Sequence, residues 1–227
     1  MAKVNQMTPH DHELVSNAVS KAEQTTDGEI VTIVTEKSDA YHDVGLHYAL
    51  GLLFLFLSSL AIFPSFWIDA SALVASGWKT RYTTAQYMTL MLGMSLLIFL
   101  AGRYLFAWMP LRMAVTPKAT KERRVRRRAI QYFKVGAERR TMALTGILIY
   151  LSMAEHRAEI VADDAIANKV DPEVWGDAMA ALIDGAKRGE PGEGMAAAVE
   201  KVGVVLSEHF PKSDANPNEL PDRLIEL

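Results

Sequence analysis

The chain has 227 residues, of which 50% are hydrophobic and 22% are charged, and its formal net charge is −3 at pH 7. It contains no cysteine, which excludes a disulfide framework, a thiol nucleophile and a cysteine-based zinc site. The small net charge hides an uneven distribution, because long uncharged stretches alternate with a dense basic one. The positions of the charges therefore say more about the organisation of the chain than their sum does.

The residues before the first uncharged stretch predict one helix followed by one strand. Thr8 and Pro9 form a helix start, and Asp27 with Gly28 ends the element. The apolar residues between them recur at helical spacing: Leu14, Val15, Ala18, Val19 and Ala22. The next stretch, EIVTIVT, is rich in β-branched residues and predicts a strand of about six residues. One helix and one strand cannot enclose a core, so this segment needs the rest of the chain.

Two long stretches without charge follow this segment. The first lies between Asp43 and Asp69 and the second runs from Tyr82 to Gly102. Each is long enough to cross the roughly 30 Å hydrocarbon core of a bilayer as a helix. Buried helices of soluble proteins are usually shorter and keep a polar stripe, and the first stretch lacks the basic start and cleavage site of a signal peptide. We therefore predict a transmembrane hairpin of two helices within residues 44–110.

The stretch KERRVRRRAI, Lys121–Ile130, follows the second predicted span closely. An excess of Lys and Arg next to a span marks the cytoplasmic side, and the linker between the spans carries only Lys79 and Arg81. We predict a multi-pass protein of the inner (plasma) membrane with both termini in the cytoplasm. Anionic lipid headgroups are the predicted partners of five side chains: Arg123, Arg124, Arg126, Arg127 and Arg128. Nucleic acid is not favoured, because no stacking aromatics are interleaved among these arginines.

The remainder of the chain predicts a helix, two strands and two further helices. The basic stretch continues as a helix with an apolar face of Val125, Ala129, Ile130, Phe133 and Ala137. Strands are expected at Gly146–Ser152 and Ala158–Ala162, joined by a polar connection. Asp171 begins the next helix, and a glycine-containing turn precedes the last one, Glu193–His209. The tail, residues 212–227, is expected to be irregular, with docking against the domain as the alternative.

The predicted strands should form one sheet across the hairpin. A helix connects the strand Ile30–Thr35 to Gly146–Ser152, so we expect these two to be parallel, and Ala158–Ala162 to run antiparallel to the latter. Residues 1–43 and 111–211 would then form a single split domain around the hairpin 44–110.

The order of these elements resembles the TPM domain family, which includes the thylakoid lumen protein of photosystem II repair. The resemblance rests on EIVTIVT after a Thr-Asp-Gly turn, on the strands GILIYLS and AEIVADD joined by EHR, and on the two helices that follow. It covers roughly residues 8–37 and 121–210. It implies an α/β fold with a Rossmann-like small mixed sheet flanked by helices. The two-helix transmembrane hairpin predicted above lies outside the resemblance and would interrupt this fold. It also implies a divalent cation near the strand ends and, for some members, a weak acid phosphatase activity.

Two hypotheses about function follow from these residues. Asp163 and Asp164 at a strand end, with Asp171 one short loop away, offer carboxylate oxygens to Ca²⁺ or Mg²⁺. Acidic residues of this kind are also common as solvated helix starts. The first hypothesis is therefore an interaction or accessory module on the cytoplasmic face, with a protein partner that the sequence does not identify. The alternative is a weak metal-dependent phosphatase, in which Asp27, Glu155 or His156 would support the metal site.

Overall fold

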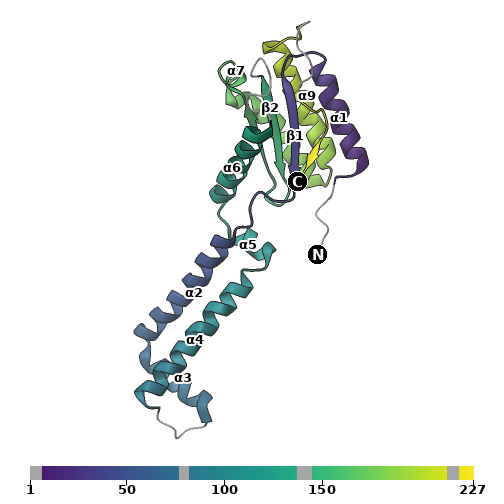
Figure 1. Ribbon diagram of the computed structural model, residues 1–227. Helices are drawn as coiled ribbons and strands as arrows, with labels where there is room; N and C mark the ends of the chain where they lie inside the picture. Colours follow the sequence, from purple (N-terminus) through teal and green to yellow (C-terminus); the bar gives the residue numbers. More distant parts are fainter. Residues whose placement is uncertain (1–6, 77–81, 137–144, 214–219) are drawn as a thin grey trace. The chain divides into compact units, whose positions relative to one another are not determined.

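The computed structural model describes residues 7–76, 82–136, 145–213 and 220–227. They form two compact units (Figure 1). Unit 1 consists of Met1–Asp39 and Lys118–Leu227, and unit 2 consists of Ala40–Pro117. Two segments on either side of unit 2 in the sequence therefore build unit 1 together. Lys79, Arg81 and Ala137, which the sequence interpretation used, lie outside the described residues.

Unit 1 is a mixed α/β structure around a small sheet. The four strands among the described residues lie in the order β3-β2-β1-β4. Their bounds are Glu29–Thr35 for β1, Gly146–Ser152 for β2, Arg157–Ala162 for β3 and Ile225–Glu226 for β4. The expected directions are confirmed, since β1 pairs with β2 in parallel from Glu29 opposite Gly146 to Thr35 opposite Ser152, and β3 is antiparallel to β2.

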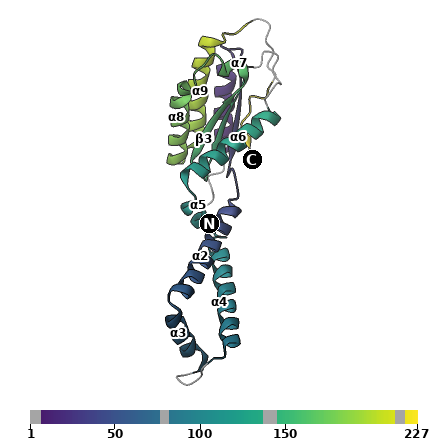
Figure 2. The same ribbon diagram turned by 90° about the vertical axis from the view of Figure 1, so that its left-hand side faces the viewer.

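Helices cover both faces of this sheet. Three of them, α1 (Pro9–Glu23), α8 (Gly176–Arg188) and α9 (Pro191–His209), pack on one face, and α6 (Lys118–Gly136) packs on the other (Figure 2). Every residue of β1 and of β2 is buried, as the nearly continuous apolar sequence of β2 predicts for a central strand.

The side chains of each strand alternate between two cores. On the α1, α8 and α9 side, Ile30 and Val34 of β1 lie with Ile147 and Ile149 of β2. On the α6 side the core is made of the following residues: Val31, Ile33, Val125, Ala129, Phe133, Leu148, Tyr150 and Leu220. Alternate side chains of β1 and β2 thus pack against the apolar face of α6, whose residues recur at helical spacing. This contact attaches α6 to the sheet.

The helix ends agree with the sequence in part. Thr8 caps α1 through a capping box with Asp11, as its position predicts. The glycine-containing turn is shorter than expected: α8 ends at Arg188 and is capped by Gly189, whose φ is 81°, and Gly192 already lies inside α9. The helix that Asp171 was expected to begin starts as a 3-10 helix over Pro172–Trp175, in which Val174 is 46% exposed while Trp175 is buried.

The end of the tail docks on the sheet, which is the alternative that the sequence left open, and it does so as a short strand. Ile225 and Glu226 form β4, which is parallel to β1, and the Leu227 amide donates to the Val34 carbonyl oxygen at 3.0 Å. Upstream, the Leu220 amide donates to Oε2 of Glu29 at 3.2 Å. The tail pairs here because the second edge of β1 carries backbone groups that need partners.

Unit 2 contains α2 (His42–Ile62), α3 (Pro64–Ser76), α4 (Thr84–Leu105) and α5 (Met109–Val115). The first uncharged stretch is not one helix, because Pro64 lacks an amide hydrogen and begins a new helix. By length and composition, α2 and α4 are apolar enough to cross a membrane. They approach each other closely where residues are small: a Cβ on Gly102 would lie 3.3 Å from Cα of Ala49.

Candidate functional site

A buried polar network lies at the carboxyl ends of β1 and β2. In open α/β sheets, ligand-binding sites are commonly found at the carboxyl ends of the strands. The amide of Ser38, just beyond β1, donates to Oε1 of Glu155 at 3.1 Å. The Ser38 hydroxyl lies 2.9 Å from that of Tyr150, and the Ser152 hydroxyl donates to Oε2 of Glu155. All four residues are buried.

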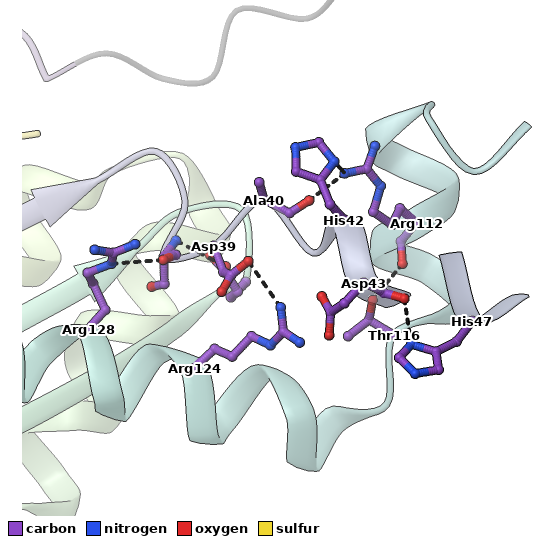
Figure 3. A network of polar contacts seen from close by, with 11 residues as sticks. Asp39, Ala40, His42, Asp43, His47, Arg112, Thr116, Arg124 and Arg128 are labelled. Carbon is purple, nitrogen blue, oxygen red and sulfur yellow. Dashed lines mark hydrogen bonds and ion pairs between the residues drawn. The ribbon is translucent and has the colours of Figure 1, made fainter. Parts of the chain in front are cut away.

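The helix α6 contributes two arginines to the same region. Nε of Arg128 donates to the carbonyl oxygen of Ser38 at 3.0 Å, and Arg124 forms an ion pair with Asp39 at 3.0 Å (Figure 3). These two arginines are four residues apart, so one face of α6 presents both. The network thereby joins the segment that leaves β1 to the helix that leads back into unit 1.

The properties of this network indicate a structural role, in which buried hydrogen bonds hold the segment after β1 in place. Burial raises the pKa of Tyr150 to about 12, against the opposing effect of its hydrogen bond with Ser38, so the phenol is neutral at physiological pH. Glu155 accepts from one amide and one hydroxyl, which are the partners that a buried carboxylate needs. The arrangement fixes the path of residues 36–39.

The other three arginines of the predicted lipid-binding group lie differently. Arg123, Arg126 and Arg127 are exposed. Arg126 faces β3: burial raises the pKa of Glu159, and the charge of Arg126 opposes that rise. The predicted group is thus distributed around the helix.

The acidic residues predicted to bind a cation each have a separate position. Oδ2 of Asp163 accepts from the Gly146 amide at 3.2 Å, at the start of β2. Asp164 begins the short helix α7 (Asp164–Ala167) and is exposed. Asp171 caps the 3-10 helix by accepting from the Glu173 amide at 3.0 Å. Among the described residues, no three His, Cys, Asp or Glu side chains form a group that could hold a metal, so the Ca²⁺ or Mg²⁺ site stays a prediction.

The residues expected to support such a site are divided between the two ends of the sheet. Asp163 follows β3 beside the start of β2, whereas Glu155 and His156 lie in the hairpin beyond the other end of β2. Seven strand residues separate these ends by about 20 Å. The expectation that Glu155 or His156 lies near Asp163 is therefore wrong, because the turn between β2 and β3 is at the other end of these strands. Asp27 precedes β1 and lies at the Asp163 end.

Sequence reasoning missed a buried carboxyl group at that end. Glu23 is 7% exposed, and its Oε1 accepts from the Ile30 amide at 2.8 Å. Burial raises its pKa to about 8, and the nearby charges of Glu29 and Asp222 add to the rise. Its Oε2 has no hydrogen-bond partner among the described residues. The sequence did contain a signal for this burial: Glu23 follows Val19 by four residues and therefore lies on the apolar stripe of α1.

A second missed residue lies in unit 2. Arg112 is 4% exposed and donates from Nε to the Phe106 carbonyl oxygen at 2.8 Å and from Nη2 to that of Ala107 at 2.7 Å. Its Nη1 donates to the Ala40 carbonyl oxygen and lies 3.1 Å from Nδ1 of His42 (Figure 3). One guanidinium thus holds the start of α2 beside the residues that follow α4.

Comparisons with known proteins add information on the fold. No protein-family model matches the sequence, and no curated protein matches it. The structure is similar to the NMR structure of the BA42 protein from the psychrophilic bacterium Bizionia argentinensis, with a TM-score of 0.56, 16% sequence identity and coverage of 100% of both chains. At this identity the similarity concerns the fold.

Proposed function

We propose that the chain is a membrane-anchored protein in which unit 2 crosses the inner membrane as a hairpin and unit 1 is a TPM-like, Rossmann-like module on the cytoplasmic face. This module acts by interaction with other proteins, as an accessory component.

One observation carries the membrane anchor. Large apolar side chains point outward along both long helices of unit 2, as with Leu55 on α2 at 70% exposure and Leu92 on α4 at 71%. The core helix of a soluble protein would bury such residues, whereas lipid would surround them. The uncharged lengths of α2 and α4 fit the hydrocarbon core.

The split of unit 1 supports the proposed topology. Since β1 precedes unit 2 in the sequence and pairs with β2, which follows it, both segments have to lie on the same side of any membrane that unit 2 enters. Two crossings return the chain to the side it left. The basic stretch in α6 favours the cytoplasm for that side.

Tag accessibility in sealed inner-membrane vesicles tests this proposal. One tag is fused to the amino end, one to the carboxyl end, and a third is inserted within residues 77–81. We expect both terminal tags to react from the cytoplasmic side and the third to react only after permeabilisation. Terminal tags on opposite sides would contradict the hairpin.

The alternative function, metal-dependent phosphate-ester hydrolysis, has its own test. The wild type is compared with Asp163→Ala/Asp164→Ala for Ca²⁺ or Mg²⁺ binding and for turnover of a phosphate ester. Because the Asp163 carboxylate also holds the Gly146 amide, Asp164→Ala alone is the better-matched variant. If the wild type shows robust turnover and Asp164→Ala abolishes it, phosphate-ester hydrolysis replaces the accessory role as the proposed function.

A further inference from the structure

The basic residues of α6 belong to two groups that face different directions. Val125, Ala129 and Phe133 lie in the core under the sheet, which fixes the orientation of the helix. At 100° per residue, Arg123, Arg127 and Lys134 then share the side opposite to this apolar face. All three are exposed. We name these three residues the α6 ridge.

The α6 ridge differs from its neighbours in how its charges are engaged. Arg124 is paired with Asp39, and Arg128 is bound to Ser38. In the ridge, by contrast, Arg123 makes hydrogen bonds of 3.4 and 3.5 Å to residues of its own helix, and no ion pair to an acidic residue is found for the ridge among the described residues. Within the part of the chain that the structure describes, the charges of the ridge are therefore less engaged than those of Arg124 and Arg128.

We propose that the α6 ridge binds the phosphate groups of anionic phospholipids, a proposal that rests on the membrane anchor proposed above. Guanidinium groups match phosphate oxygens in a bidentate way, and a lysine adds a further positive charge. The three residues extend over about 16 Å of helix, enough to reach more than one headgroup. The helix begins at Lys118, directly after unit 2 in the sequence, so Arg123 follows the end of the proposed membrane anchor by only a few residues, in the juxtamembrane zone where basic side chains attract anionic lipid.

The composition of the ridge favours a lipid over a nucleic acid. Single-stranded nucleic acids bind where aromatic rings stack on bases beside basic side chains. The described aromatic residues of α6 are not on the ridge: Phe133 is in the core, and Tyr132 packs against Tyr150, 5.9 Å between ring centroids. Charge contacts with phosphate are then the main interaction that the ridge offers.

The test uses the purified full chain in a nonionic detergent. Native mass spectrometry measures the binding of dioleoyl phosphatidylglycerol and of dioleoyl phosphatidylcholine. We expect the wild type to bind the anionic lipid more tightly than the zwitterionic one. In the triple variant Arg123→Gln/Arg127→Gln/Lys134→Gln the ratio of the two affinities should fall by a factor on the order of 100, because each basic residue contributes roughly tenfold or less. The matched control, Lys187→Gln/Arg188→Gln/Lys201→Gln, removes the same charge from exposed positions of α8 and α9 and should keep the preference.

Three results would overturn the proposal. The first is an equal loss in the two triple variants, which would mean that net charge alone is responsible. The second is a wild type without preference for the anionic lipid. The third is displacement of the lipid by inorganic phosphate or by a single-stranded oligonucleotide at similar concentration, which would move the site to a soluble anion. The vesicle tags are read on the same variants, so a failure of the anchor is seen separately from a failure of the ridge.

Discussion

The buried carboxyl group of Glu23 makes the stability of unit 1 depend on pH. Its ordinary pKa of 4.5 rises to about 8 in the folded protein. Between these two values the folded state keeps a proton that the unfolded state has released. The contribution of Glu23 to stability is therefore complete at acid pH and is lost as the pH rises from about 4.5 to about 8.

The magnitude follows from the two pKa values. One pKa unit corresponds to about 1.4 kcal/mol, and at pH 7 the unfolded carboxyl is ionised while the folded one is mostly protonated. The loss between pH 4 and pH 7 is then about 3 kcal/mol. Glu23→Gln removes the titration and keeps an oxygen for the Ile30 amide, so the variant should be more stable than the wild type near pH 7.

Pulse proteolysis in urea, applied to the full chain in detergent at pH 5, 6 and 7, measures the free energy of unfolding of unit 1. The difference between Glu23→Gln and the wild type should grow with pH. Glu13→Gln is the matched control, because Glu13 is exposed on the same helix and should show no such trend. A difference that does not change with pH would refute the reasoning.

Three further predictions concern close packing and the buried hydrogen bonds. Gly185→Ala should destabilise unit 1 by about 1–3 kcal/mol in urea unfolding, because the new Cβ would lie 2.9 Å from the carbonyl oxygen of Glu190. Gly176→Ala on the same helix is the control: its Cβ would enter open space, so this variant should be neutral or stabilising. Ala49→Cys/Gly102→Cys should form a disulfide in this cysteine-free chain, seen as a mobility shift on non-reducing gels, since the two Cβ atoms would be 3.4 Å apart. Glu155→Ala should cost about 2–4 kcal/mol in the same urea assay, because two buried donors lose their acceptor.

Local patterns predicted most of the secondary structure of unit 1. Thr8 with Pro9 marked the start of α1, and β-branched residues marked β1, because capping and strand preference act over a few residues. The connecting helix also predicted the parallel pairing of β1 with β2. By contrast, β4 was missed, since a two-residue strand has no pattern of its own and depends on the free edge of β1.

The candidate sites were harder to predict because they depend on contacts between distant residues. Ser38 and Glu155 are far apart in the sequence, and the sheet brings them together at one edge. The basic stretch was recognised as a whole, but only the packing of α6 shows that Arg124 and Arg128 contact the segment after β1, whereas Arg123 and Arg127 are exposed.

The insertion of unit 2 between β1 and α6 has a consequence for biosynthesis. The ribosome makes β1 first, and its parallel neighbour β2 appears only after unit 2 and α6 have been translated. During that interval β1, an apolar and β-branched segment, has neither of its neighbouring strands and is exposed to wrong pairing. Completion of the sheet therefore has to wait for the hairpin, and a defect in the hairpin would leave nascent chains that aggregate or recruit chaperones.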